Sequence, residues 1–144
     1  MPFEYRYPRA ALTVDAVVFG QSPRGLHVLL IQRARDPYRG AWAFPGGFVD
    51  LHETLEEAAR RELEEETGIR LPRLEQLRAF DGVHRDPRER VISVVHTAVV
   101  ELAAHTPKAS DDAQDARWFA LDALPSLAFD HAEVLGCARE RLGI

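Results

Sequence analysis

Stretches of apolar, largely β-branched residues predict the strands of this chain. Residues 11–20 (ALTVDAVVFG) and 27–33 (HVLLIQR) flank the turn-forming segment QSPRG, and this arrangement favours a β-hairpin. Residues 90–101 (RVISVVHTAVVE) form the longest strand candidate, and residues 74–84 are expected to pair with them across the segment RDPRE. Residues 115–120 predict a last short strand.

Two segments have the apolar spacing of amphipathic helices. The first begins at Thr54, where Glu57 completes a capping box, and it ends at Gly68. The second covers residues 130–143, with Asp130 as the expected N-cap. Its apolar residues at helical spacing are Val134, Leu135, Ala138 and Leu142. The order strands, helix, strands, helix predicts an α+β domain in which a mixed sheet lies between helices.

Length and composition limit the classes of protein that need to be considered. A chain of 144 residues, 46% of them apolar, can bury one substantial core, which predicts a single domain over residues 1–144. The 18 basic and 23 acidic residues give a net charge of -5, which argues against sequence-independent binding to nucleic acid. No apolar run reaches the roughly 18 residues of a membrane span, and the N-terminus lacks the apolar core of a signal peptide. We therefore expect a cytoplasmic protein without a membrane partner.

The first helix carries carboxylates on its apolar side. At 100° per residue, Glu62 and Glu66 project onto the stripe of apolar residues, and Glu65 lies at the margin of that stripe. A buried charge must be paired, neutralised or bound to a cation, and like charges four residues apart repel each other. Arg61 can offset only one of these charges by pairing with Glu65 or with Glu53. The remaining carboxylate oxygens therefore predict a site for Mg²⁺, with Mn²⁺ as an alternative.

The other charges of this helix are expected to lie on solvated faces (Glu56, Glu57, Arg60, Glu64). An exposed helix with salt bridges between residues four apart is the alternative interpretation of so much charge. The preceding segment AWAFPGGF favours the metal site, because Pro45 fixes a bend and Gly46 and Gly47 let the backbone approach a ligand closely. A backbone carbonyl of this segment could complete the coordination of the metal.

Residues 47–69 (GFVDLHETLEEAARRELEEETGI) resemble the Nudix box at every defining position. The matching residues are Gly47, Glu53, Arg61, Glu62, Leu63, Glu65, Glu66, Gly68 and Ile69. This resemblance implies an α/β/α sandwich and the hydrolysis of a pyrophosphate bond in a nucleoside diphosphate linked to another group. It also implies that Glu62, Glu66 and the carbonyl of Gly46 are metal ligands. By the same resemblance, Glu65 is a further ligand or a catalytic acid that orients water, and Arg61 pairs with Glu53 to hold helix and loop in register.

The resemblance leaves the residue that accepts the water's proton open, because in this family the base is often an acid on a loop outside the box. The candidates are Glu65, Glu89, Asp111 and Asp112. For each of the last three taken singly, an acid that forms a turn is the favoured interpretation.

Basic and aromatic residues around the glycine segment are candidates for substrate binding. Arg33 ends an apolar strand that leads toward the glycines and is the first choice for a phosphate contact, with Arg35 beside it. Gly47 allows close approach of the substrate. Trp42 and Phe48 could stack on a base, with core packing as an equal alternative. Arg85, Arg88 and Arg90 add positive charge in a later loop.

The segments that frame the box favour one substrate. YPRAALTVDAVVF, RDPYRGAWAFPGGFVD, RDPRERVISV and LAFDHAEVL are similar to the Nudix branch that contains ADP-ribose pyrophosphatases and the ADP-ribose-sensing domains of repressors of NAD metabolism. The resemblance implies cleavage of ADP-ribose to AMP and ribose 5-phosphate. The alternatives are hydrolysis of oxidised or ordinary nucleoside triphosphates or dinucleoside polyphosphates, and a non-catalytic ADP-ribose sensor domain.

The sensor is the less favoured alternative, because such repressors carry an additional winged-helix segment and the sequence ends at Ile144. Nudix proteins of this kind are often dimers, which implies a homodimer. The aromatic residues of the N-terminus are candidates for its interface (Phe3, Tyr5, Tyr7).

Overall fold

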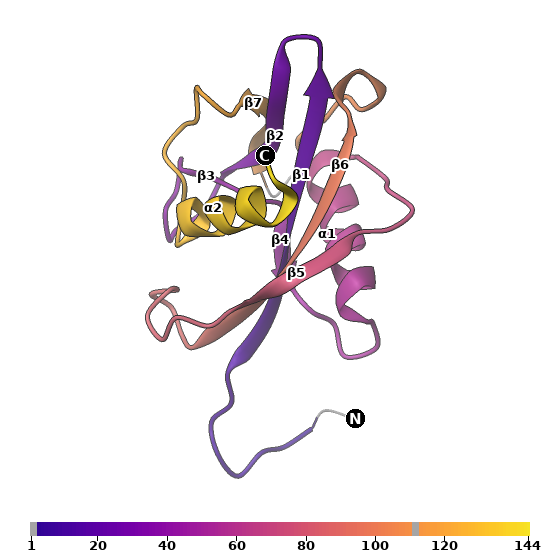
Figure 1. The fold of residues 1–144 in the computed structure, drawn as a ribbon. Coiled ribbons are helices and arrows are strands. Elements are labelled where there is room, and N and C mark those ends of the chain that lie inside the picture. Colours follow the sequence, from indigo (N-terminus) through magenta and orange to yellow (C-terminus); the bar gives the residue numbers. More distant parts are fainter. Residues whose placement is uncertain (1–2, 111–112) are drawn as a thin grey trace.

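The computed structural model describes residues 3–110 and 113–144, in which a mixed seven-stranded sheet carries one helix on each face (Figure 1). The elements in chain order are β1 (Ala11–Ser22), β2 (Gly25–Arg33), β3 (Trp42–Ala43), β4 (Gly46–Phe48), α1 (Leu55–Thr67), β5 (Glu75–Phe80), β6 (Val91–Glu101), the 3-10 turn η1 (Leu102–Ala104), β7 (Ala113–Ala120) and α2 (His131–Leu142). The predicted α+β sandwich is confirmed. No helix in the described ranges is long and apolar enough to cross a membrane.

Strand β1 lies at the centre of the sheet. It pairs in parallel with β6 from Ala11 and Val91 to Gln21 and Glu101, and β6 pairs antiparallel with β5. The predicted hairpin between β1 and β2 is present, but it is short, because only residues 19–22 of β1 pair with β2. Pattern alone did not predict the parallel pairing of β1 with β6, which joins strands about 80 residues apart in the sequence.

Strands β1 and β2 separate beyond their short hairpin, and β3 and β4 fill the gap between them. The first half of β1 pairs with β4, so that Asp15 lies opposite Gly46 and Val14 opposite Gly47. Strand β2 pairs with β3 at Ile31 and Gln32. Because β7 occupies the other edge of β2 over the same residues, β3 must lie on the edge that faces β1. The glycine segment is therefore enclosed within the sheet.

The two faces of the sheet form two hydrophobic cores. In β1, Val17 and Phe19 belong to the core under α2, whereas Val14, Ala16 and Val18 belong to the core under α1. Residues 13–20 are all buried, as expected for a strand that is covered on both faces. The alternation also assigns Asp15 and Thr13 to the face of the sheet that carries α2.

Local sequence signals explain why α1 begins and ends where it does. The Thr54 hydroxyl accepts from the Glu57 N–H at 3.2 Å, and the Glu57 carboxylate accepts from the Thr54 N–H at 2.9 Å, which is the predicted capping box. Gly68 ends the helix at a φ of 74°. One expectation for this helix is wrong: Glu56 is half-buried rather than simply solvated, because it accepts a hydrogen bond of 2.8 Å from the Leu74 N–H.

Candidate active site

The Glu66 carboxylate of α1 reaches a cavity on the opposite face of the sheet through the glycine segment. A cavity of about 280 Å³ is lined by residues of the α2 side, including Asp15 and His131, and also by Glu66 of α1. Gly46 and Gly47 make this crossing possible, since they carry no side chains. A Cβ on Gly47 would lie 2.6 Å from Glu62 Oε1, and a Cβ on Gly46 would overlap the Val14 carbonyl and the Asp15 carboxylate.

Glu62 and Glu66 form a close pair of acids at this opening. Burial, and then the neighbouring Glu62 carboxylate within hydrogen-bonding reach, raise the pKa of Glu66 to about 9. The Gly46 N–H donates to Glu66 and offsets part of this shift. Two carboxylates at hydrogen-bonding distance need a shared proton or a cation between them.

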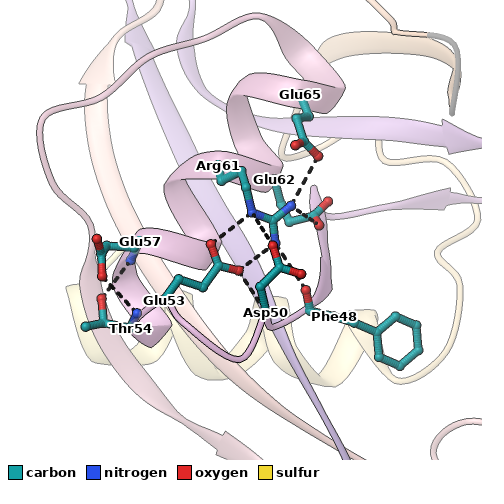
Figure 2. Close-up of polar contacts among 8 residues, drawn as sticks. All are labelled: Phe48, Asp50, Glu53, Thr54, Glu57, Arg61, Glu62 and Glu65. Atoms are coloured by element: carbon teal, nitrogen blue, oxygen red, sulfur yellow. Dashed lines mark hydrogen bonds and ion pairs between the residues drawn. The ribbon is translucent and has the colours of Figure 1, made fainter. Parts of the chain in front are cut away.

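Arg61 organises the acids that surround this pair (Figure 2). Its Nε and Nη2 donate to Glu53 at 2.9 and 2.7 Å, and its Nη1 donates to Glu62 at 2.9 Å. Nη2 also donates to the Phe48 carbonyl at 3.2 Å, which ties α1 to β4. These contacts, those with Glu53 first, raise the pKa of Arg61 above its ordinary value. The expected pairing of Arg61 with Glu53 is therefore present, and it joins helix and loop.

Glu65 lies apart from the other two box acids. Its side chain is 56% exposed and accepts from Arg61 Nη1 at 3.2 Å, so it points along the outer surface of α1 (Figure 2). Like Glu62, it is not among the residues that line the cavity, whereas Glu66 is. In residues 3–110 and 113–144, no three His, Cys, Asp or Glu side chains converge as a ready-made metal site.

The donors that do converge fit a hard divalent cation. They are the Glu62 and Glu66 carboxylates beside the backbone of Gly46 and Gly47, which means oxygen donors without imidazole or thiolate. Mg²⁺ is bound in proteins by one or two carboxylates together with water and substrate phosphates, so two glutamates suffice. The arrangement is suited to bringing a metal ion and a phosphate group into the cavity together.

Basic side chains line the cavity alongside these acids. They are Arg33, Arg35, Arg85 and Arg88. The Arg33 guanidinium is fixed by a 2.7 Å hydrogen bond from Nε to the Pro37 carbonyl and lies 4.9 Å from the centre of the Phe129 ring. Burial, and then the positive charge of Arg88, lower the pKa of Arg33. An anionic group in the cavity would relieve the repulsion between these two guanidinium groups.

Several predicted residues do not line this cavity, among them Trp42, Glu89 and Arg90. Trp42 packs edge-on against Phe119 with ring centres 4.7 Å apart and belongs to the core under α2, so core packing accounts for it. Glu89 is exposed and does not line the cavity. The candidate bases Asp111 and Asp112 lie outside the residues that the structure describes. Phe48 is half-exposed and lines the cavity, where Arg88 lies 5.7 Å from its ring.

Sequence reasoning missed several polar residues of the cavity. Asp15 is buried, accepts from the Ser93 hydroxyl and lies 3.8 Å from His131 Nε2. Asp86 is buried and binds both the backbone N–H and the guanidinium of Arg88, which lowers its pKa against the opposing effect of burial. Asp15 had a signal in the sequence, since it is the one charge in an apolar run predicted to be a strand. Asp86, in a polar turn-like segment, had none.

Known proteins resemble this chain over most of its length. The model of the NUDIX domain matches residues 9–136. The ADP-ribose pyrophosphatase of Methanocaldococcus jannaschii is 40% identical over 134 residues, which cover 92% of this chain and 75% of that protein. The ADPR responsive transcriptional repressor NtrR of Acinetobacter baylyi is 39% identical over 140 residues, which cover 94% of this chain but only 56% of the repressor. The solved NUDIX domain of Shewanella oneidensis NrtR, complexed with ADP ribose, superposes with a TM-score of 0.85 at 36% identity. The match covers 94% of this chain and 90% of the NrtR domain.

Proposed function

The chain belongs to the NUDIX domain family and is a Nudix pyrophosphohydrolase, and from this premise we propose that it cleaves ADP-ribose to AMP and ribose 5-phosphate. The observation that carries the proposal is the Glu62–Glu66 pair, in which Glu66 lines a cavity together with four arginines. The relatives support this substrate, because both an ADP-ribose pyrophosphatase and a domain complexed with ADP ribose align with more than nine tenths of the chain.

Each residue of the site has a distinct role in this proposal. Glu62, Glu66 and the Gly46 carbonyl would hold Mg²⁺, which Mn²⁺ can replace. When bound, such an ion neutralises charge on the phosphates and lowers the pKa of its water. Arg61 orients the Glu62 carboxylate through the 2.9 Å hydrogen bond and holds Glu53 on the loop before α1. Gly47 leaves space for that carboxylate beside the backbone.

The cavity residues bind the substrate in this scheme. Arg33 donates to a phosphate oxygen, because Pro37 fixes its Nε while its two Nη groups have no acceptor among the described residues. Arg35 adds positive charge to the same wall. Glu65 is a candidate base that shares Arg61 with Glu62 and so lies beside the paired acids.

A metal-dependent assay tests this function. Purified protein is incubated with ADP-ribose and Mg²⁺, with and without a chelator, and the products are separated by ion-exchange chromatography. We expect AMP and ribose 5-phosphate only in the presence of the metal. A parallel panel of nucleoside triphosphates, oxidised nucleoside triphosphates and dinucleoside polyphosphates tests the alternative substrates. Faster turnover of any of these than of ADP-ribose would reassign the substrate and leave the chemistry unchanged.

A second candidate function is an ADP-ribose sensor that binds without cleaving. The 39% identity with an ADPR responsive repressor supports it. The complete set of box acids favours turnover instead, because a domain that only binds needs no paired Glu62 and Glu66. Calorimetry with ADP-ribose separates the two functions: tight binding with no product after prolonged incubation with Mg²⁺ would favour the sensor.

We also propose that residues 1–144 act as a single catalytic domain and that the protein is a cytoplasmic homodimer. The exposed Phe3, Tyr5 and Tyr7 near the N-terminus are the candidate interface residues. Light scattering on purified protein measures the oligomeric state directly.

A further inference from the structure

Asp130 and His131, at the start of α2, contact two different loops of the cavity. This inference rests on the proposed function, because it assigns roles to residues that support the metal-binding and substrate-binding segments. We propose that both are positioning residues. His131 fixes the segment 44–47 that supports the metal, and Asp130 fixes the basic loop 85–88 that faces the substrate.

His131 is attached to the glycine segment through a backbone hydrogen bond. Its ring is 3% exposed, and its Nδ1 accepts from the Phe44 N–H at 3.2 Å. The ring also stacks on Phe44, with centres 4.9 Å apart and planes at 28°. Because Phe44 lies two residues before Gly46, these contacts set the position at which the chain enters the glycine segment.

The hydrogen bond from the Phe44 N–H sets the tautomer of His131. A backbone N–H can only donate, so Nδ1 must carry a lone pair and the proton must be on Nε2. Nε2 faces Asp15 Oδ2 at 3.8 Å, and the Ser93 hydroxyl donates to the same oxygen. Asp15 also lies opposite Gly46 in the pairing of β1 with β4. His131 therefore contacts the segment at Phe44, and β1 pairs with it at Gly46.

Asp130 is attached to the other loop. It is the N-cap residue of α2, yet its side chain makes no capping hydrogen bond, which corrects the expectation from the sequence. Its two oxygens instead accept from Arg85 Nε and Nη2 at 2.9 and 2.7 Å. The Arg85 side chain is only 5% exposed, so this bidentate pair is well sheltered from solvent. Arg85 precedes Asp86, whose carboxylate holds Arg88 in the cavity wall.

The two attachments should affect different steps. Loss of the His131 contact loosens the segment beside Glu62 and Glu66, which should weaken metal binding about 10-fold or more, as is usual when a partner behind a metal ligand is removed. Loss of the Asp130 contact loosens the arginine loop, which should raise the KM for substrate about 10-fold at saturating metal. A residue needed only for stability would change both quantities together or neither.

The experiment measures both quantities for each variant. Mn²⁺ affinity is measured by electron paramagnetic resonance without nucleotide. KM and kcat for ADP-ribose are measured in a separate kinetic assay at saturating Mg²⁺. We expect His131→Leu to weaken Mn²⁺ binding about 10-fold and change KM less than about threefold. His131→Asn should restore much of the affinity, since its amide oxygen can accept from the Phe44 N–H. Asp130→Ala should show the opposite pattern, with Asp130→Asn intermediate because it keeps one acceptor for Arg85.

Matched controls come from elsewhere in the chain. His96 is a buried histidine on β6 that does not line the cavity, and Asp115 pairs with Arg117 at 2.6 Å on β7. His96→Leu and Asp115→Ala should leave both constants within about twofold of wild type. If the leucine or alanine variants fail to fold, two further variants still test the opposed patterns. His131→Phe keeps a ring against Phe44 but has no acceptor for the Phe44 N–H, and Asp130→Asn keeps one acceptor for Arg85.

The possible outcomes are distinct. Equal changes in both constants for His131→Leu and Asp130→Ala, or no change in either constant for these two variants, would overturn the positioning roles. Wild-type protein that binds no Mn²⁺ and cleaves no nucleotide pyrophosphate would instead overturn the proposed function itself. Opposed patterns in the two sets of variants support the inference.

Discussion

Replacing Gly47 with alanine tests whether the position of the Glu62 carboxylate controls catalysis. A Cβ on Gly47 would lie 2.6 Å from Glu62 Oε1 and 2.7 Å from its carboxyl carbon. Close carbon–oxygen contacts in proteins begin at about 3.3 Å, so the carboxylate must move by roughly 0.7 Å. Gly47 does not have a left-handed backbone conformation, so alanine introduces no backbone strain at this position.

The displacement should reduce activity far more than stability. The atoms that move are the end of a flexible side chain, so we expect the free energy of unfolding to change by no more than about 1 kcal/mol. The moved carboxylate, however, loses its 2.9 Å hydrogen bond with Arg61 and its alignment with Glu66. A misplacement of about 1 Å can reduce a rate about 100-fold, which corresponds to about 2.7 kcal/mol of activation free energy.

The assay compares kcat/KM for ADP-ribose with the midpoint of urea unfolding. Gly136→Ala is the matched control, since Gly136 lies in α2 and a Cβ there would meet nothing within 4 Å. We expect the control to keep wild-type activity and gain up to about 1 kcal/mol of stability from helix propensity. If Gly47→Ala folds and keeps kcat/KM within about threefold of wild type, the argument that Glu62 must occupy this position is refuted.

Three further variants and conditions extend the test. Glu66→Gln should abolish metal-dependent turnover with the fold intact, whereas Glu57→Gln, which keeps the capping box, should change turnover less than about twofold; equal losses would show that the two faces of α1 were assigned wrongly. Metal-free protein should lose stability as the pH rises from 4.5 toward 9. The raised pKa of Glu66 contributes stability that is fully present below pH 4.5 and is lost as the pH approaches about 9. Thermal melting of wild type and Glu66→Gln at several pH values checks this, and a slope that persists in the variant would exclude Glu66 as its source. Arg33→Leu should raise KM about 10-fold with a smaller effect on kcat, because it removes a phosphate contact; an unchanged KM would show that Arg33 does not bind the substrate.

The helix and its acids could be predicted because their signals are local. Capping by Thr54, termination at Gly68 and the inward projection of Glu62 and Glu66 each depend on residues within one or two helical turns. Physical rules about caps and buried charge apply at that range without knowledge of the rest of the fold. The pairing of β5 with β6 belongs to the same class, since the two strands are neighbours in the sequence.

The rest of the site depends on contacts between distant segments. Strands β3 and β4 have two and three residues, too few for any periodicity, and they form only because β1 and β2 separate around them. Asp130 has the sequence context of a cap but lies within reach of Arg85, 45 residues earlier, and a bidentate guanidinium pair is a stronger interaction than a capping hydrogen bond.

Sheet register is what brings the distant parts of the site together. Asp15 lies on the cavity face because the parallel register of β1 and β6 sets Ala11 against Val91, and successive residues of a strand face opposite sides. A slip of one residue would turn Asp15 toward the core under α1 and away from His131. Asp15 therefore helps to specify the register as well as the chemistry of the site, since the slip would bury its charge among apolar residues.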